Sequence, residues 1–268
     1  MDSFRRTMLS LGSCLALLAA PAAMAAPASA AASPPVVYDA LGDSYASGFG
    51  VLPMMGLCGQ SDAAYAVQID GRMKIALDDF NACAGATVQK MIDEQLSGLD
   101  EETKLVTVTI GGNDIGWVPT IGACLLSTDV NCAAAINAST GAISYVLPTL
   151  LNQAYASIEA KAPNAHVIVT GYAPFFSPES GDYLNASVQE QQAMNDGANL
   201  LNATIAGVAA EHGFQFVDVT KRFAGHGVNS RRPYIQDLNG VGPFHPTAAG
   251  YRAYAVSLIS SINPRSWR

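Results

Sequence analysis

Short apolar runs alternate with helical patterns along most of the chain, and this alternation limits the folds that the sequence can adopt. Five of the runs have the length of a strand and cover residues 36–41, 75–81, 105–110, 166–171 and 214–219. Helical patterns separate several of them, at residues 87–96, 148–161 and about 187–212. A chain that alternates strands with helices builds a parallel sheet covered on both faces. The sequence therefore predicts an α/β fold.

The clearest of the helices begins near Ser187. Ser187 and Glu190 have the spacing of a capping box. Apolar residues then recur at steps of four and three, at Met194, Ala198, Leu201, Ile205 and Val208. Gly213 follows the last turn and is a typical helix terminator, so the pattern predicts a long amphipathic helix.

The first apolar run ends in Gly-Asp-Ser-Tyr (residues 42–45), which makes Ser44 a candidate nucleophile. Ligands of parallel sheets bind beyond the carboxyl ends of the strands, and Ser44 lies at such an end. The third run ends in Gly-Gly-Asn (residues 111–113), so both stretches are expected at one rim of the sheet. Gly-Asp-Ser is also common in ordinary turns. Asp39 lies inside the first run, where a buried carboxylate needs a partner or a raised pKa.

Four histidines are candidates for the base that a serine nucleophile needs. His245 is preferred because Pro246 restricts it to an extended backbone, and prolines on both sides stiffen its loop. His166 opens a strand, away from the expected rim, and His212 lies at the end of a helix. His226 lies in a glycine-rich loop and remains an alternative.

Asn113 allows two interpretations. Its side-chain amide can donate a hydrogen bond to an oxyanion, and the two glycines before it let the backbone approach a ligand closely. The other interpretation is a simple turn, in which Asn113 and Asp114 cap the next segment.

The first thirty residues have the composition of an export signal. Arg5 and Arg6 supply a positive start, residues 8–20 are apolar, and Ala-x-Ala sites follow. We therefore expect a signal peptide over residues 1–30, cleaved somewhere in 25–32, and a secreted single domain over residues 31–268. The paired arginines leave a twin-arginine signal open beside an ordinary secretory signal.

The chain without its signal is acidic. Residues 1–30 hold Arg5, Arg6 and Asp2, so the 14 basic and 22 acidic residues fall to 12 and 21, a net charge of −9. This sign of charge disfavours nucleic acid and anionic membrane surfaces as partners.

An even number of cysteines remains after the signal, and an even number in an exported chain indicates disulfides. They are Cys58, Cys83, Cys124 and Cys132. Three pairings are possible, of which the sequential one closes the shortest loops. No Cys-x-x-Cys pair and no nearby histidine supports a zinc site instead.

Four stretches together resemble the SGNH, or GDSL, hydrolases. They are residues 38–45 (Tyr-Asp-Ala-Leu-Gly-Asp-Ser-Tyr), 81–87 (Asn-Ala-Cys-Ala-Gly-Ala-Thr), 111–114 (Gly-Gly-Asn-Asp) and 245–247 (His-Pro-Thr). Their order and wide spacing match the family, and the resemblance runs from about residue 36 to the end. The second stretch and the cysteine positions are most similar to the family's secreted bacterial lipase/esterase branch.

The resemblance implies a flavodoxin-like, three-layer α/β/α sandwich with a five-stranded parallel sheet. It also implies hydrolysis of esters or thioesters without a metal or other cofactor. Ser44 would be the nucleophile and His245 the base. The oxyanion hole would comprise the backbone N–H groups of Ser44 and Gly85 and the side-chain amide of Asn113.

The same branch of the family pairs its cysteines sequentially. The resemblance therefore supports the pairs Cys58–Cys83 and Cys124–Cys132.

Two positions depart from the family pattern. Asp39 stands where the family usually has an apolar residue. Many members have an aspartate three residues before the histidine, where this chain has Gly242. Some members of the branch use a main-chain carbonyl instead, so we expect the carbonyl of Gly242 or Pro243 to orient His245. Asp237 and Asp218 are the alternatives.

These observations predict a secreted serine carboxylic-ester hydrolase, an esterase or lipase that forms an acyl-enzyme with a small-molecule or lipid ester. The alternatives are a carbohydrate O-acetyl esterase and, from another class, a non-catalytic carbohydrate- or surface-binding protein on the same fold. We expect a monomer with no stable membrane insertion. Pocket residues are expected in loops at residues 49–57, 117–126 and 175–183, but the sequence specifies neither the acyl chain nor the alcohol.

Overall fold

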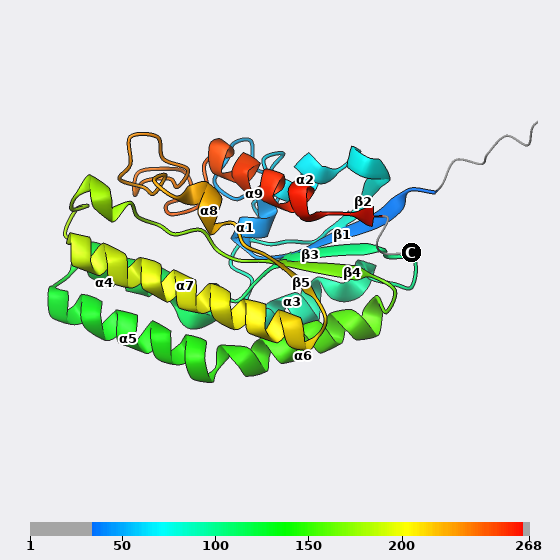
Figure 1. The fold of residues 1–268 in the computed structure, drawn as a ribbon, viewed down its shortest axis with the longest axis horizontal. Coiled ribbons are helices and arrows are strands. Elements are labelled where there is room, and N and C mark those ends of the chain that lie inside the picture. The colour runs from blue at the N-terminus through cyan, green and yellow to red at the C-terminus, as the bar shows by residue number, and fades with distance from the viewer. Residues whose placement is uncertain (1–33, 265–268) are drawn as a thin grey trace, which may run out of the picture. The chain divides into compact units, whose positions relative to one another are not determined.

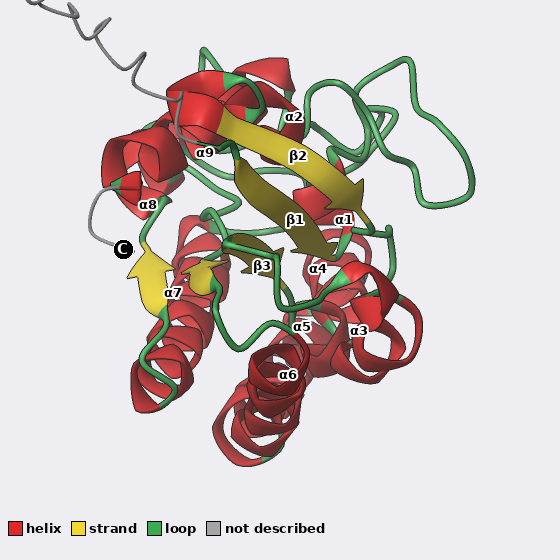
Figure 2. Cartoon of the chain, turned by 90° about the vertical axis from the view of Figure 1, so that its right-hand side faces the viewer, coloured by secondary structure: helices red, strands yellow, loops and turns green. Residues whose placement is uncertain are grey.

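The computed structural model describes residues 34–264, which belong to one compact unit. The expected signal peptide and its cleavage window lie outside the described residues, so both stay predictions. The unit contains one five-stranded parallel sheet with the strand order β2-β1-β3-β4-β5, which is the flavodoxin-like order. Helices cover both faces of the sheet (Figures 1 and 2). The predicted three-layer α/β/α sandwich is therefore confirmed.

The strands coincide with the five apolar runs. They are β1 (Val36–Gly42), β2 (Ile75–Phe80), β3 (Leu105–Thr109), β4 (His166–Thr170) and β5 (Gln215–Val217). All residues of the central strand β3 are buried, as expected for a strand covered on both faces. The edge strand β5 is shorter than the predicted 214–219. The Asp218 carboxylate accepts a hydrogen bond from the Thr220 N–H at 2.8 Å, so the chain already turns there into the next helix.

Two groups of helices enclose the sheet (Figure 1). On one face lie α2 (Tyr65–Ile69), α8 (Thr220–Phe223) and α9 (Ala248–Ser261). On the other lie α3 (Val88–Glu94), α5 (Asp129–Tyr145), α6 (Leu147–Lys161) and α7 (Val188–Glu211), with α4 (Trp117–Leu126) packed on α5. Shorter elements are α1 (Ser44–Ser47) and the 3-10 turns η1 (Arg72–Lys74), η2 (Leu96–Gly98), η3 (Asn113–Ile115) and η4 (Pro178–Ser180). Within the described residues no single helix is long and apolar enough to cross a membrane; α5 and α6 meet that standard only as a pair bent by 45°.

The ends of α7 follow from its sequence. The Ser187 hydroxyl accepts a hydrogen bond from the Glu190 N–H, and the Glu190 carboxylate accepts one from the Ser187 N–H at 2.9 Å. This is the predicted capping box. Gly213, with φ 68°, follows the helix in a left-handed conformation that glycine adopts at little cost.

Two helices on the site side of the sheet differ from the sequence prediction. The loop predicted at residues 117–126 is wrong, because these residues form α4. Pro119 lies in the first turn of α4, where a missing N–H breaks no intrahelical hydrogen bond. Helix α5 was not predicted, because its small and polar residues leave only Cys132 and Ile143 buried and give no apolar stripe.

Both disulfides join neighbouring cysteines in the chain order. Cys58 pairs with Cys83, and Cys124 pairs with Cys132. The first joins the loop after α1 to the loop after β2, and the second joins α4 to α5. These are the sequential pairs that the family resemblance implied.

Asp39 is fully buried at an irregularity in the pairing of β1 with β2. Its carboxylate accepts hydrogen bonds from the Asp79 N–H at 3.0 Å and from the Thr103 hydroxyl at 2.7 Å. Burial raises the pKa of this carboxyl, and the two donors offset part of that effect. Asp39 therefore has the partners that a buried carboxylate needs.

Candidate active site

Ser44 follows β1 through a turn that requires glycine at position 42. Gly42 has φ 128°, and a Cβ there would lie 2.2 Å from the carbonyl oxygen of Thr109. The buried side chain of Gln95 holds Gly42 from both sides. Its Oε1 accepts from the Gly42 N–H at 2.8 Å, and its Nε2 donates to the Gly42 carbonyl at 2.9 Å. Ser44 is thereby fixed as the first residue of α1, beyond the carboxyl end of β1.

His245 lies directly against Ser44. Its Nε2 is 2.7 Å from the Ser44 Oγ, and the two side chains belong to residues that are 7% and 5% exposed. Its Nδ1 is 3.0 Å from the carbonyl oxygen of Pro243. Because a carbonyl can only accept, Nδ1 carries the hydrogen and Nε2 is the acceptor for the serine hydroxyl. The Gly242 carbonyl accepts instead from the backbone N–H of His245, at 3.0 Å.

The loop before His245 turns through an unusual backbone conformation at Phe244. Phe244 has φ 61°, which side-chain-bearing residues seldom adopt, and its ring packs against Phe175 and Phe176. The Phe244 carbonyl accepts a hydrogen bond from the Tyr45 hydroxyl at 2.6 Å. Tyr45, which follows Ser44, is therefore hydrogen-bonded to Phe244, which precedes His245.

Aromatic rings surround the imidazole of His245. The ring centroids of Phe49, Tyr45 and Trp117 lie 4.9, 5.3 and 5.5 Å away. Burial lowers the pKa of His245 from its ordinary 6.5 to about 4, although the nearby backbone carbonyls act in the opposite direction. Within the part of the chain that the structure describes, no carboxylate pairs with His245. The imidazole is therefore neutral near pH 7.

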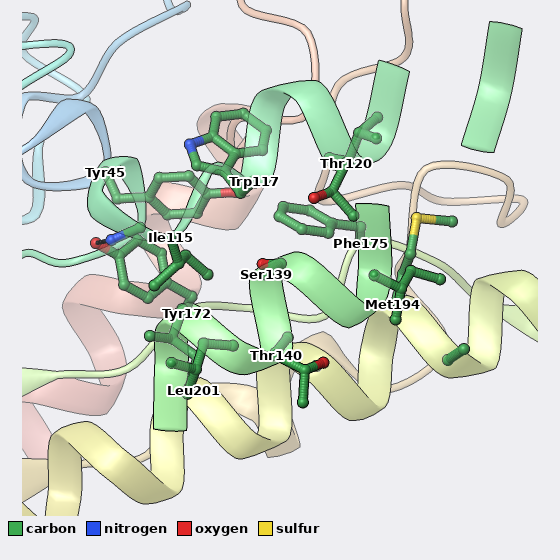
Figure 3. Close-up of a pocket in the computed structure, with 17 residues that line it drawn as sticks. Tyr45, Ile115, Trp117, Thr120, Ser139, Thr140, Tyr172, Phe175, Met194 and Leu201 are labelled. Carbon is green, nitrogen blue, oxygen red and sulfur yellow. Dashed lines mark hydrogen bonds between the residues drawn. The ribbon is translucent and has the colours of Figure 1, made fainter. Parts of the chain in front are cut away.

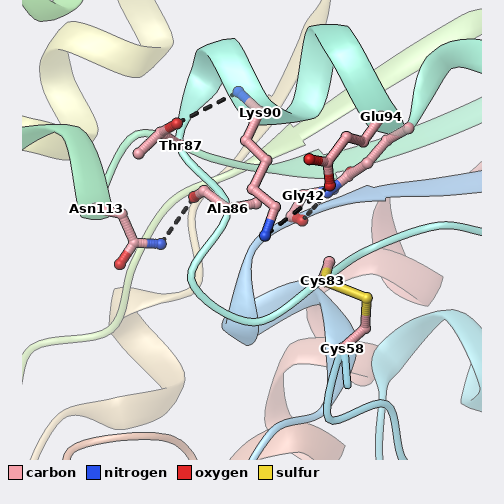
Figure 4. Close-up of polar contacts among 9 residues, drawn as sticks. Gly42, Cys58, Cys83, Ala86, Thr87, Lys90, Glu94 and Asn113 are labelled. Atoms are coloured by element: carbon pink, nitrogen blue, oxygen red, sulfur yellow. Dashed lines mark hydrogen bonds and ion pairs between the residues drawn. A yellow bond between two sulfur atoms is a disulfide. The ribbon is translucent and has the colours of Figure 1, made fainter. Parts of the chain in front are cut away.

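Asn113 is the first residue of η3, which follows β3, and Gly85 lies in the loop after β2. The Asn113 Nδ2 donates to the Ala86 carbonyl at 2.8 Å (Figure 4). The Asn113 Oδ1 accepts from the Trp117 indole N–H at 3.3 Å. These contacts fix the amide and leave one of its two N–H groups available. Among the described residues, the backbone N–H groups of Ser44 and Gly85 donate to no protein acceptor. Gly85 has φ 78°, a conformation suited to glycine.

The other candidate histidines and the two candidate aspartates have hydrogen-bond or ring partners other than Ser44 and His245. His166 contacts Gln215, His212 contacts Glu159 and Asn152, and His226 stacks on Tyr234. Asp218 accepts from the N–H and hydroxyl of Thr220, and Asp237 accepts from the Asn239 N–H. The structure thus brings Ser44 and His245 together and leaves the two aspartates in local turns.

A pocket extends from this site between α4, α5 and α7 (Figure 3). It holds about 600 Å³ of space free of protein atoms, part of it open to solvent. Tyr45, Tyr172 and Trp117 lie at one end and Met194 at the other. None of the described residues that line the pocket is charged, and most are apolar.

Part of this pocket was not foreseen from the sequence. Trp117 and Phe175 line the pocket and lie within the segments where pocket residues were expected. Phe49 also lies in such a segment, but it contacts His245 and does not line the pocket. Ile136 and Ile143 come from α5, whose sequence carries no periodic signal. Several exposed residues of segment 49–57, including Leu52 and Leu57, do not line the pocket.

Comparisons with known proteins agree with this geometry. The model of the GDSL-like Lipase/Acylhydrolase family matches residues 40–253. Lipase 1 of Streptomyces coelicolor is 36% identical over 243 residues, which are 87% of this chain and 90% of that protein. The structure is similar to crystal structures of an extracellular lipase from Streptomyces rimosus (35% identity) and of phospholipase A1 from Streptomyces albidoflavus NA297 (34% identity). Both have a TM-score of 0.81, over 85% of this chain and 100% of theirs.

Proposed function

Since the chain belongs to the GDSL-like lipase/acylhydrolase family and is a serine ester hydrolase, we propose that Ser44 is its nucleophile and His245 its general base. One observation carries this assignment: the Ser44 Oγ lies 2.7 Å from the unprotonated nitrogen of an imidazole whose other nitrogen is bound to the Pro243 carbonyl. The carbonyl fixes the tautomer as a carboxylate would, without a full negative charge.

The reaction proceeds through an acyl-enzyme. The Ser44 Oγ attacks the ester carbonyl carbon while the His245 Nε2 takes its proton. The tetrahedral intermediate collapses, the bond to the alcohol oxygen breaks, and the protonated imidazole returns that proton to the leaving alcohol. Water then attacks the acyl-serine with His245 again as base, which releases the carboxylic acid and restores Ser44.

The negative charge on the intermediate's oxygen needs donors that are in place beforehand. We propose that the N–H groups of Ser44 and Gly85 and the free N–H of the Asn113 amide are these donors. Their lack of protein acceptors among the described residues, together with the fixed orientation of the Asn113 amide, supports this assignment.

We further propose that the substrate is an ester with an extended apolar acyl chain. The uncharged, mainly apolar pocket starts beside the rings that contact His245 and continues between α5 and α7. An acetyl group is too short to reach the far end of this lining at Met194, so a carbohydrate O-acetyl esterase fits less well. The names of the relatives, lipase and phospholipase A1, support the same substrate class. Family membership also favours an enzyme over a non-catalytic binding protein.

The catalytic assignment is tested with Ser44→Ala. The variant should keep its fold, lose covalent labelling by an organophosphonate and lose turnover of p-nitrophenyl esters. Retention of more than about a thousandth of the wild-type kcat would contradict the role of Ser44, because loss of a nucleophile costs far more.

The substrate class is tested by filling the pocket. Gly197 lines the pocket on α7, and a Cβ built there meets nothing within 4 Å, so Gly197→Leu should place its side chain in open space. We expect kcat/KM to fall for p-nitrophenyl palmitate and to change little for the acetate. Gly207→Leu is the matched control, since Gly207 lies on the same helix, equally open but outside the pocket. Equal losses for both esters would contradict an acyl pocket.

Export is part of the proposal. The signal-like residues 1–30, two disulfides and the similarity to an extracellular lipase support it. N-terminal sequencing of protein from the culture medium should give a start within residues 25–32. A monomer remains our expectation and is checked by analytical ultracentrifugation.

A further inference from the structure

The carboxylate of Asp43 is buried next to the proposed nucleophile. Asp43 is 2% exposed, and its Oδ1 accepts from the backbone N–H of Tyr45 at 2.9 Å. Its Oδ2 accepts from the hydroxyl of Tyr172. The Tyr45 N–H belongs to the peptide directly after Ser44, so Asp43 holds the start of α1 by the residue that follows the nucleophile.

Tyr172 extends this contact to the loop after β3. Its hydroxyl oxygen accepts from the Gly112 N–H at 3.0 Å, and Gly112 directly precedes Asn113. Tyr172 is itself held rigidly, because Asn202 on α7 accepts from its backbone N–H at 2.7 Å and donates to its carbonyl at 2.8 Å. The Tyr172 ring lies edge-on to that of Tyr45, with centroids 5.2 Å apart (Figure 3).

We propose that Asp43 and Tyr172 are positioning residues that fix the separation between two donors of the oxyanion hole. The proposal rests on the proposed function of Ser44 and Asn113. The chain of contacts runs from the Tyr45 N–H through the Asp43 carboxylate and the Tyr172 hydroxyl to the Gly112 N–H. It therefore connects the peptide that follows the Ser44 N–H with the residue that precedes Asn113.

This arrangement acts on the transition state rather than on binding of the ester. An oxyanion hole works only while its donors converge on the place where charge develops, and small displacements are costly. Asp43 and Tyr172 act through Ser44 and Asn113 and have no direct part in the bond changes. Loss of the contact should therefore lower kcat and leave KM nearly unchanged.

Tyr172→Phe is the main test. It removes the hydroxyl and keeps the ring, which also lines the acyl pocket. We expect kcat for a p-nitrophenyl ester to fall by about tenfold or more, with KM within about twofold. A kcat within about twofold of wild type would overturn the proposal, and so would an effect confined to KM.

Tyr38→Phe is the matched control. Tyr38 is also buried, and its hydroxyl is hydrogen-bonded to the Thr107 hydroxyl at 2.7 Å, so it connects β1 with β3 inside the sheet. The two variants should show similar drops in Tm, while kcat of Tyr38→Phe stays within about twofold of wild type. An equal loss of kcat in both variants would make the role of Tyr172 merely structural and overturn the proposal.

A double-mutant cycle with Asn113→Ala separates positioning from other effects. If Tyr172 acts through the Asn113 donor, Tyr172→Phe should cost less than about threefold in kcat once that donor is gone. If kcat of the double variant falls by the product of the two losses in the single variants, the proposal is overturned.

Asp43→Asn is a second variant that disrupts the contact between Asp43 and Tyr172. The Asn Oδ1 can still accept from the Tyr45 N–H, but its amide nitrogen cannot accept from Tyr172. It should lower kcat as Tyr172→Phe does, and unchanged kcat would overturn the proposal even if Tyr172→Phe fails to fold. Failure of this proposal leaves Ser44→Ala inactive, whereas turnover by Ser44→Ala would refute the proposed function itself.

Discussion

Protonation of the histidine base should inhibit this enzyme at a much lower pH than it inhibits an enzyme with an exposed histidine base. Burial lowers the pKa of His245 from 6.5 to about 4. At about pH 5 a histidine with the ordinary pKa is about 3% neutral, whereas one with a pKa of about 4 is about 90% neutral. If neutral His245 is the base, kcat/KM of Asp43→Asn at about pH 5, relative to that variant's own value at neutral pH, should therefore be about thirtyfold higher than an ordinary histidine allows.

The assay is kcat/KM for a soluble p-nitrophenyl ester, read at the isosbestic wavelength of p-nitrophenol from about pH 4 to about pH 9. Re-assay at neutral pH after each exposure controls for acid inactivation. Asp43 is a second group that can titrate, since burial raises its pKa to about 7. Asp43→Asn removes it, so a limb near pH 7 that disappears in this variant belongs to Asp43. A limb near pH 6.5 that persists in Asp43→Asn would refute the assignment of a buried, neutral base.

Three further predictions concern single side chains. Asn113→Ala should lower kcat by roughly a hundredfold or more with little change in KM, because the amide serves the oxyanion; steady-state kinetics in which only KM rises would indicate a substrate-binding role. Asp237→Asn and Asp218→Asn should each keep kcat within about tenfold, and a loss of about ten-thousandfold in either would identify a triad aspartate. Replacement of Cys58 and Cys83 by serine should lower the free energy of unfolding by about 2–4 kcal/mol in urea titrations; unchanged stability, or a crossed pairing found by non-reducing peptide mapping, would contradict the disulfide.

Much of the fold was predictable because the information is local. The strands are apolar runs, and the capping box at Ser187 and Glu190 is a short-range pattern, so both were found where the sequence placed them. The family resemblance added the flavodoxin-like, three-layer sandwich. Helix α5 escaped prediction because the contacts that stabilise it are with α4 and α7, not a periodic stripe of its own.

The candidate site was predictable where it depends on residue type and order. The family stretches contain all four proposed catalytic and oxyanion-hole residues, Ser44, Gly85, Asn113 and His245. Gly242 occupies the position where many family members have an aspartate, so the sequence also indicated that this aspartate is missing. The contact of Tyr172 with Asp43 joins residues 129 positions apart. No spacing rule predicts such a contact, because only the order of the strands brings the segment after β1, which holds Asp43, close to the segment after β4, which holds Tyr172.

The aromatic enclosure of His245 also affects the thermodynamic stability of the folded chain. Between about pH 4, near the pKa of His245 in the folded chain, and its ordinary pKa of 6.5, His245 binds a proton in the unfolded chain but not in the folded chain. The contribution of His245 to stability is therefore complete above about pH 6.5 and declines as the pH falls toward 4, by up to about 3 kcal/mol. The rings that keep the base neutral for catalysis thus give His245 a contribution to stability that is lost in acid, a trade-off between activity and stability at one side chain.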